Sequence, residues 1–230
     1  MAAGIGKRMQ PVTLSVPKPL VKVKGVAMIE TIIEALKKNE IEEIYIVVGY
    51  LKEQFNYLQS KYQNISILVN PYYDKYNNIS SLYVAKDYLE DSIILDGDQI
   101  IHNSNILNPY FERSGYNAVF VNEHTNEWLM QVNENGVVEA CSRNGGNEGW
   151  QLYSVSRWSK EDGQRLKRHL EIEFEEKENR QIYWDDIPMF CYPNEYILGI
   201  REMNSDDIIE IDNISELIMM DNSYSCYLEK

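Results

Sequence analysis

Cysteine is scarce in this sequence, and its three copies form no framework. Cys141, Cys191 and Cys226 are far apart, odd in number and lack the spacing of a metal site, so neither a disulfide scaffold nor a thiolate-bound metal is expected. Long apolar runs are also missing, which argues against a membrane-spanning helix, and the basic N-terminus lacks the apolar core of a secretory signal. These absences predict a protein of the reducing cytoplasm with no membrane partner.

Acidic residues are absent from the first 25 positions, although they dominate the rest of the chain. The whole sequence carries 22 lysines and arginines against 36 aspartates and glutamates, which gives a net charge of −14 and a pI near 4.7. Such a surface repels phosphate backbones, so no nucleic-acid partner is expected. The opening segment instead carries five cations, namely Lys7, Arg8, Lys18, Lys22 and Lys24. A local positive excess of this kind predicts an anionic ligand.

Small residues in the same segment suit a phosphate group, because they let backbone N–H groups approach its oxygens closely. The predicted nucleotide contacts here are Ala2, Ala3, Gly4, Gly6 and Lys7. The guanidinium of Arg8 can donate paired hydrogen bonds to the same oxygens. The segment therefore predicts a polyphosphate-binding loop, with a flexible basic tail as the simpler alternative.

This loop is neither of the two commonest phosphate-binding motifs. A dinucleotide fingerprint would need a third glycine at the position of Met9, and no Gly-Lys-Ser/Thr triplet follows. The longer pattern AAGxGxRM, followed by Pro11, Thr13 and the run Pro17-Lys18-Pro19-Leu20, resembles the signature of the nucleotidyltransferases that activate sugars and alcohols as nucleotide diphosphates. The resemblance implies that a nucleoside triphosphate binds at this loop.

Alternating helix and strand patterns in the first half predict a doubly wound α/β fold. Apolar residues at helical spacing predict a helix over 27–39, and the apolar run at 44–48 predicts a parallel strand covered on both faces. Further helices are expected at 51–62 and 79–89, and further strands at 65–69 and 92–95. This rhythm predicts a mostly parallel central sheet that binds ligands at the carboxyl ends of its strands.

The second half changes to short strands, which predicts a small antiparallel layer that binds the acceptor. Strands are expected at 116–121, 128–132, 137–141 and 151–155, with a hairpin turn at 134–136. A polar loop at 142–149, a charged helix at 159–179, strands at 196–201 and 208–211, and a helix from Ser215 follow. With no linker, residues 1–230 are expected to form one domain, with a nucleotide-binding half at 1–115 and an acceptor-binding half at 116–230.

The start of the chain departs from the pattern that the nucleotidyltransferase signature implies. In chains with this signature a short apolar strand leads directly into the AAG loop, whereas Met1 stands where that strand should end. We therefore expect that the N-terminal strand of the central sheet is missing and that Met1 is internal to the native product. Such a gap would leave neighbouring strands unpaired and would cost several kcal/mol of burial and hydrogen bonding.

Two aspartates are the leading candidates for a metal site. Reactions of nucleoside triphosphates need a divalent cation, and Mg²⁺ binds carboxylates, phosphate oxygens and water. Asp98 lies in ILDGDQ after an apolar strand, and Asp212 lies in EIDNISEL between a strand and a helix. Both positions match the two metal-binding aspartates of the nucleotidyltransferases, which implies that they hold Mg²⁺. Asp96 shares a face with Asp98 if the strand continues through both, so it is a third candidate, although each aspartate alone could simply cap a turn.

Polar residues before the predicted strand at 92–95 indicate which group of nucleotidyltransferases the chain resembles. Asn77, Asn78 and Ser81 could hydrogen-bond the edge of a pyrimidine, or they could cap the helix that begins there. The stretch YNNISSLY, together with TNEW at 125–128 and YWDD at 183–186, resembles the bacterial CTP:phosphocholine cytidylyltransferases over almost the whole chain. This narrower resemblance implies CTP as the nucleotide and a small phosphorylated amino alcohol as the acceptor.

Aromatic and acidic residues in the second half suit a cationic acceptor. A trimethylammonium group donates no ordinary hydrogen bond, so aromatic faces and carboxylates hold it. The candidates are Glu127, Trp128, Tyr183, Trp184, Asp185 and Asp186. Trp128 and Trp184 could instead be core residues, because large aromatic side chains dominate cores. Asp185 and Asp186 could also bind a primary ammonium, which leaves phosphoethanolamine and 2-aminoethylphosphonate open as acceptors.

Taken together, these features predict a Mg²⁺-dependent cytidylyltransferase that converts CTP and phosphocholine into CDP-choline and pyrophosphate. Arg8 would hold the triphosphate, and Lys18 would draw the acceptor and the α-phosphate together. A phosphate monoester is already ionised near neutral pH, so the reaction needs no general base, and none of His102, His124 and His169 has an obvious catalytic setting. The alternative from another class is a non-catalytic nucleotide-binding module, and the sequence predicts no oligomeric state.

Overall fold

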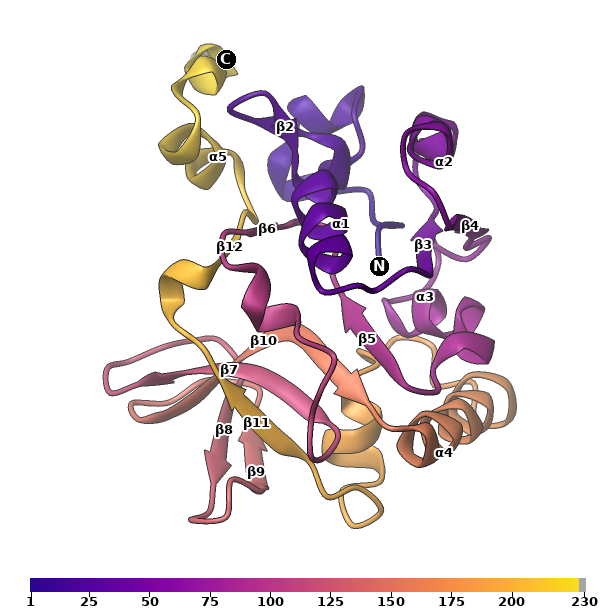
Figure 1. Cartoon of the computed structure of the whole chain (residues 1–230), viewed down its shortest axis with the longest axis vertical. Helices are drawn as coiled ribbons and strands as arrows, with labels where there is room; N and C mark the ends of the chain where they lie inside the picture. The colour runs from indigo at the N-terminus through magenta and orange to yellow at the C-terminus, as the bar shows by residue number, and fades with distance from the viewer. Residues whose placement is uncertain (228–230) are drawn as a thin grey trace.

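Two parallel strands and the helices packed on them form the first half of the molecule. The computed structural model describes residues 1–227 (Figure 1). β3 (Ile44–Val48) pairs in parallel with β4 (Ile65–Val69), with Ile44 opposite Ile65 and Val48 opposite Val69. The apolar face of α1 (Met28–Lys38) and residues Phe55 and Leu58 join these strands in one hydrophobic cluster. The βαβ rhythm predicted for this half is therefore confirmed.

The predicted helices differ from the observed ones mainly in their ends. α1 agrees with the expected 27–39, whereas the segment 51–62 is divided into a 3-10 helix, η4 (Lys52–Phe55), and α2 (Asn56–Lys61). The segment 79–89 is likewise divided into α3 (Ile79–Val84) and the 3-10 helix η5 (Lys86–Tyr88). The charged helix expected at 159–179 is α4 (Lys160–Glu171), which continues as a π-helix, η7 (Ile172–Glu176).

A six-stranded mixed sheet organises the second half and reaches into the first. Its order is β11-β7-β10-β8-β9, with β5 also paired to β10. The bounds are β5 (Ser92–Leu95), β7 (Gly115–Val121), β8 (Leu129–Val132), β9 (Val138–Ser142), β10 (Gly149–Trp158) and β11 (Gly199–Glu202). Among the described strands of this sheet, only β11 and β7 pair in parallel. β10 is longer than the predicted 151–155, because it pairs with three strands, β5, β7 and β8.

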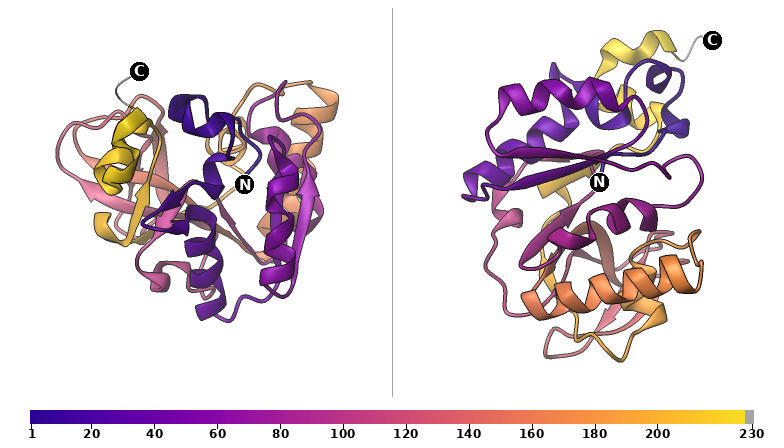
Figure 2. Two further views of the ribbon diagram at one scale, coloured as in Figure 1. Left: turned by 90° about the horizontal axis from the view of Figure 1, so that it is seen from above. Right: turned by 90° about the vertical axis from the view of Figure 1, so that its right-hand side faces the viewer.

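The C-terminal segment returns to the N-terminal one. β12 (Ile208–Glu210) pairs antiparallel with β6 (Gln99–Ile101), and α5 (Ile214–Met220) follows. The segment then packs beside the small hairpin of β1 (Lys22–Val23) and β2 (Val26–Ala27), where the Tyr224 hydroxyl donates to the Lys22 carbonyl at 2.7 Å. Both views in Figure 2 show the yellow C-terminal segment near the indigo start of the chain. This return brings residues 210–212 close to the N-terminal loop.

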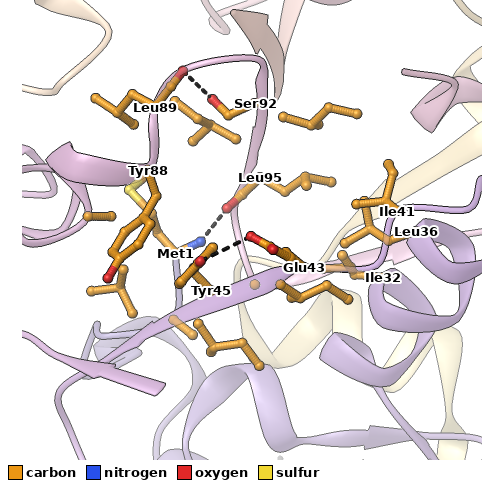
Figure 3. Close-up of a pocket in the computed structure, with 18 of the residues that line it drawn as sticks. Met1, Ile32, Leu36, Ile41, Glu43, Tyr45, Tyr88, Leu89, Ser92 and Leu95 are labelled. Atoms are coloured by element: carbon orange, nitrogen blue, oxygen red, sulfur yellow. Dashed lines mark hydrogen bonds between the residues drawn. The ribbon is translucent and has the colours of Figure 1, made fainter. Parts of the chain in front are cut away.

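An apolar cavity of about 500 Å³ separates β3 from β5 (Figure 3). At one end of it the Met1 amine donates to the Leu95 carbonyl, and the Gly97 N–H donates to the Met1 carbonyl at 2.7 Å. Elsewhere, within residues 1–227, no strand pairs with the edges of β3 and β5 that face this cavity. The cavity lies where the sequence analysis expects a further strand. None of the helices in the described part of the chain combines the length and apolar character needed to cross a bilayer.

Candidate active site

The N-terminal loop begins at the carboxyl end of β3, which is where parallel sheets bind their ligands. The Ala2 N–H donates to the Val47 carbonyl at 2.8 Å, and the Tyr50 N–H donates to the Ala3 carbonyl at 3.1 Å. These bonds fix Ala2 and Ala3, and the chain then turns at Gly4, where an added Cβ would meet no atom within 4 Å. The backbone after Ala3 is therefore free to approach a ligand.

Because residue 6 is a glycine, the backbone of the loop can lie close to the side chain of Lys18. Its φ is 67°, a left-handed conformation that glycine adopts without strain. A Cβ at Gly6 would lie 3.0 Å from the Cβ of Lys18 and 3.1 Å from the Cγ2 of Thr13. The Thr13 hydroxyl also donates to the Gly6 carbonyl at 2.8 Å. The loop thus packs on the 3-10 helix η3 (Lys18–Leu20), and Lys18 is buried beside it.

Lys18 lies between the two aspartates that the sequence analysis assigns to a metal. Its ammonium donates to Asp98 Oδ2 at 2.6 Å and to Asp212 Oδ1 at 2.9 Å. Arg8 pairs with the same Asp212 oxygen at 2.8 Å. Burial alone lowers the pKa of Lys18, but the charges and hydrogen bonds of Asp98 and Asp212 outweigh it, so the pKa is raised. Lys18 is therefore a protonated counter-ion shared by two carboxylates.

Glu210 is a third carboxylate of this cluster, and the sequence analysis missed it. Oxygens of Asp98, Glu210 and Asp212 lie within 4.8 Å of one another. Desolvation, followed by the charges of Asp98 and Asp96, raises the pKa of Glu210, although its exposed surface limits the size of this effect. A signal was present in the sequence, because Glu210 precedes Asp212 by two residues, the same spacing that singles out Asp96 beside Asp98.

The three carboxylates fit a divalent cation that prefers oxygen ligands. Asp98 Oδ1 is buried and has no hydrogen-bond partner within the described residues, so one ligand atom is available. Asp96 is outside this group of three, although it lies close enough for the charge of Asp98 to affect it. Desolvation, with the charge of Asp98, raises the pKa of Asp96 to about 6. The donor set of Asp98, Glu210 and Asp212 therefore suits Mg²⁺, with the Lys18 ammonium in competition for the same oxygens.

A cavity of about 340 Å³ is lined by the loop, by the cations Arg8 and Lys18, and by two of the three clustered carboxylates, Asp98 and Asp212. The predicted site residues that line it are Ala2, Ala3, Gly4, Gly6, Lys7, Arg8, Lys18, Asn78, Ser81, Asp96, Asp98 and Asp212. The larger cavity between β3 and β5 contains Asp96 but none of the three clustered carboxylates. The smaller, polar cavity is therefore the candidate active site, built from both ends of the chain.

The amides and the serine at the start of α3 are held by hydrogen bonds to other segments of the chain. Asn78 Oδ1 accepts from the Trp184 N–H at 2.9 Å, and Ser81 Oγ accepts from Asn70 Nδ2 at 3.1 Å. Asn78 and Ser81 nevertheless line the cavity, and Asn78 links it to the predicted acceptor segment. Asn77 lies outside, in a neighbouring hollow with Lys7, and its Nδ2 donates to the Gln181 carbonyl at 3.1 Å.

Two of the predicted acceptor aromatics come together. The rings of Trp128 and Tyr183 are 5.8 Å apart and nearly perpendicular, and Phe190, which the sequence analysis did not select, is 5.5 Å from Trp128. Tyr183 is exposed and Trp128 is half-buried, so part of this group faces solvent. Glu127 is exposed, and its N–H donates to the Thr125 hydroxyl at 3.1 Å. Trp128 and Tyr183 therefore form an aromatic pair that is partly exposed to solvent.

Trp184 and the two aspartates after it have different surroundings. Trp184 is 2% exposed and packs against Trp158 and Tyr116, which agrees with the core alternative for this residue. Asp185 Oδ1 is buried and has no hydrogen-bond partner within the described residues. Desolvation, followed by the charge of Asp96, raises the pKa of Asp185 to about 8. Asp186 is buried and pairs with Arg143.

Residues 1–142 match the family described as Nucleotidyl transferase, and this match covers more than half of the chain. The chain therefore belongs to the nucleotidyltransferase family. The family expected from the N-terminal signature is confirmed, and so is the expectation that the protein is an enzyme of this kind.

Relatives that match nearly the whole chain are cytidylyltransferases. The 2-aminoethylphosphonate cytidylyltransferase of Lancefieldella rimae is 37% identical over 226 residues, which cover 97% of this chain and 91% of the relative. The choline-phosphate cytidylyltransferase of Streptococcus pneumoniae is 33% identical and covers 94% of this chain and 93% of its own.

Solved structures agree with the fold. The CTP:phosphocholine cytidylyltransferase of Streptococcus pneumoniae superposes with a TM-score of 0.89 at 32% identity and covers 96% of both chains. The inositol-1-phosphate CTP transferase of T. maritima superposes with a TM-score of 0.75 at 16% identity, a likeness of fold alone, over 97% of this chain and 91% of its own. The predicted α/β nucleotidyltransferase fold is thus confirmed, with a central sheet that is mixed.

Proposed function

We propose that this protein is a Mg²⁺-dependent cytidylyltransferase that transfers a cytidylyl group from CTP to a small acceptor bearing a phosphate or phosphonate and a cationic amine. The observation that carries the proposal is the single cavity in which the glycine loop, Lys18 and the carboxylates of Asp98 and Asp212 meet. A nucleotide-binding module without activity has no need of a carboxylate cluster opposite its phosphate loop. The cytidylyltransferase relatives support the choice of CTP.

Asp98, Glu210 and Asp212 would hold the metal, because each offers an oxygen to one common point. When bound, Mg²⁺ would neutralise phosphate charge and thereby make the α-phosphorus more open to attack. Lys18 now occupies part of this carboxylate cluster. Its four-carbon stem lets the ammonium turn toward a phosphate once another cation shares the carboxylates.

The chain's own residues would orient the reactants. The loop N–H groups and Arg8 would bind the triphosphate, and Lys18 would hold the acceptor oxygen near the α-phosphorus. The acceptor oxygen forms a bond to the α-phosphorus as the bond from that phosphorus to the β-phosphate oxygen breaks. Pyrophosphate leaves with the electron pair of the broken bond, and Arg8 would stabilise the charge on it. No proton must be removed from the ionised acceptor.

Phosphocholine and 2-aminoethylphosphonate are the two leading acceptors, with phosphoethanolamine as a close variant. The Trp128 and Tyr183 pair favours phosphocholine, because aromatic faces attract a trimethylammonium group. The buried Oδ1 of Asp185, which has no cation partner within residues 1–227, favours a primary ammonium, because this can donate a hydrogen bond to it. The 37% identical relative is named for 2-aminoethylphosphonate, and the 33% identical one for choline phosphate.

Pyrophosphate release tests the proposal. CTP and UTP should each be assayed with and without MgCl₂ against phosphocholine, phosphoethanolamine, 2-aminoethylphosphonate and glucose 1-phosphate. We expect Mg²⁺-dependent release with CTP and at least one amine acceptor, and little with glucose 1-phosphate. Asp98→Ala should abolish release and leave the circular dichroism spectrum unchanged, whereas an active Asp98→Ala enzyme would contradict the metal assignment. Nucleotide binding without release under every condition would support the non-catalytic module instead.

A further inference from the structure

The aromatic group of the acceptor region already contains a cation, which the chain itself supplies. The guanidinium carbon of Arg143 lies 3.9 Å from the centre of the Phe190 ring and 5.8 Å from that of Trp128. Both distances are within the range in which an aromatic face attracts a cation. Arg143 thus uses the ring faces that a trimethylammonium group would need.

The position of Arg143 follows from the register of the β8–β9 hairpin. Leu129 pairs with Ser142 in this antiparallel ladder. Just outside this ladder, Trp128 precedes β8 and Arg143 is the first residue of the turn after β9, so both lie at the open end of the hairpin. Phe190 belongs to the π-helix η8 (Ile187–Cys191). The end of the hairpin and η8 thus bring the two rings to the guanidinium.

A buried carboxylate fixes the guanidinium in this place. Arg143 Nε and Nη2 donate to Asp186 Oδ1 at 2.8 and 2.5 Å. Asp186 is 3% exposed, and its Oδ2 accepts from the Tyr183 N–H at 3.0 Å. Within residues 1–227 no other lysine or arginine pairs with Asp186. Removal of the guanidinium would leave a buried charge without a partner, so a guest cation must compensate Asp186 before it can displace Arg143.

The neighbouring aspartate offers what a primary ammonium requires. Asp185 Oδ1 and the Tyr116 hydroxyl are both buried and lie close enough to interact with each other, and neither has another hydrogen-bond partner in the described structure. An ammonium with N–H groups can donate to such an oxygen, whereas a trimethylammonium group cannot. The two adjacent aspartates therefore differ in availability, since Arg143 neutralises Asp186, whereas no lysine or arginine within residues 1–227 pairs with Asp185.

We propose that Arg143 is a specificity-determining residue, whose guanidinium occupies the aromatic group and turns the acceptor site toward a primary ammonium and away from a quaternary one. The proposal rests on the proposed cytidylyltransferase activity and adds the class of acceptor to it. The acceptor that fits is an aminoalkyl phosphate or phosphonate with a free –NH₃⁺ group. Among the proposed acceptors, phosphocholine is then disfavoured.

Kinetics of Arg143 variants test this role. The ratio of kcat/KM for phosphocholine to that for 2-aminoethylphosphonate should rise about tenfold in Arg143→Ala, because the ring faces become available to the trimethylammonium group. Arg143→Gln, which keeps a hydrogen-bond donor for Asp186, should shift the ratio in the same direction. Arg165→Ala is the matched control, because Arg165 also pairs with an aspartate and lies over a tyrosine ring, in α4. An unchanged ratio in both Arg143 variants would overturn the proposal.

A binding measurement separates this proposal from the proposed reaction. Choline and ethanolamine, which carry the two ammonium types without a phosphate, can be titrated while tryptophan fluorescence is recorded. Arg143→Ala and Arg143→Gln should bind choline about tenfold more tightly than the wild type and the Arg165→Ala control. Failure to gain choline affinity in both Arg143 variants would overturn the role of Arg143, even in an active enzyme. A gain in affinity in a protein that releases no pyrophosphate would support Arg143 and refute the reaction.

Discussion

At the scale of the residue, three carboxylates meet in the candidate active site beside two cations that pair with only two of them. Lys18 pairs with Asp98 and Asp212, and Arg8 with Asp212, whereas Glu210 pairs with neither cation and Asp98 Oδ1 has no hydrogen-bond partner within the described residues. Like charges at this separation repel one another, so a cluster of this kind lowers stability unless a cation offsets it. The arrangement is understandable if the cluster serves a divalent cation during turnover.

Glu210→Gln tests the third carboxylate. The loss of one anionic ligand should weaken binding of Mg²⁺ or Mn²⁺ about tenfold or more and should raise the metal concentration needed for half-maximal pyrophosphate release. Electron paramagnetic resonance of Mn²⁺ measures the binding without any need for activity. Glu202→Gln, an exposed position on β11, is the control. Equal Mn²⁺ affinity in Glu210→Gln and the wild type would remove Glu210 from the metal site.

Asp185 makes stability depend on pH. Desolvation, with the charge of Asp96, raises its pKa from 3.8 to about 8 in the folded chain. The folded state therefore holds this proton more tightly than the unfolded state, so the free energy of unfolding should fall as pH rises from about 4 to about 8. Asp185→Asn removes this titration, and at pH 8 it should be more stable than the wild type by about 1 kcal/mol or more.

Urea unfolding at pH 5 and pH 8 measures this difference. The gain from Asp185→Asn should be larger at pH 8 than at pH 5, because the cost of keeping the wild-type carboxyl protonated in the folded state rises with pH up to its pKa of about 8. Asp206→Asn, at an exposed position on the surface, should give the same small change at both pH values. A gain for Asp185→Asn that is equal at the two pH values would show that the carboxyl does not titrate in this range.

The site residues that could be predicted from the sequence lie in recognisable motifs, whereas the one that could not is defined by contacts that form on folding. Arg8, Lys18, Asp98 and Asp212 lie in motifs whose composition is unusual along the chain, so the sequence alone singles them out. Arg143 lies in no motif that singles it out. Its neighbours Trp128 and Phe190 come from the other side of the β8–β9 hairpin and from η8, which are distant in the sequence. Contacts of that kind exist only after folding.

At the scale of the element, α4 packs so closely on the loop before β5 that one of its residues must lack a side chain. Gly163 is buried in α4, and an added Cβ would collide with the carbonyl oxygen of Leu89. Alanine normally stabilises a helix interior by about 1 kcal/mol relative to glycine. Here we expect the opposite sign, because backbone atoms must move apart.

Gly163→Ala should lower the free energy of unfolding by about 1–3 kcal/mol, as overpacking does. Thermal unfolding followed by circular dichroism measures the change. Gln164→Ala, the adjacent exposed position in the same helix, is the control and should be neutral or slightly stabilising. A stabilised Gly163→Ala protein would mean that α4 is free to shift away from Leu89.

Strands were predicted more closely than helices, and the reason is physical. β3, β4 and β5 have the bounds expected from their apolar runs, because the isoleucines of these strands pack in the core, even though Ser66 and Val69 of β4 are exposed. The predicted helices at 51–62 and 79–89 are each divided into a 3-10 segment and an α segment, which the apolar spacing alone does not distinguish. The length of β10 depends on its three neighbours and could not be read from its own residues.

At the scale of the whole molecule, the site depends on contacts between distant parts of the chain. Lys18 bonds to Asp98, 80 residues away, and to Asp212, 194 residues away. The pairing of β5 with β10 joins the predicted halves 1–115 and 116–230 into one sheet. The division into halves at residues 115 and 116 stays a prediction. The pairing of β5 with β10 means that the sheet runs continuously through both halves.

The facing edges of β3 and β5 have a consequence for how copies of this protein behave together. Apart from the hydrogen bonds of Met1 and Ala2, no strand within residues 1–227 pairs with these edges, and the cavity between them is lined with isoleucine and leucine. Free backbone groups of this kind are a template for a strand from another molecule. The net charge of −14 opposes such contacts at low salt. Light scattering should therefore increase as NaCl is raised from about 0.05 M to about 0.5 M, where charge repulsion is screened.

Ile93→Lys provides the matched variant, because it puts a charge on β5 within this cavity. Its scattering should stay low across the same range of salt, since a lysine on a strand edge opposes pairing with a second strand. Equal scattering from the wild type at low and high salt would show that the edges are protected. Otherwise the edge that borders the active-site loop also controls self-association of the protein, which should then be weakest in buffers of low ionic strength.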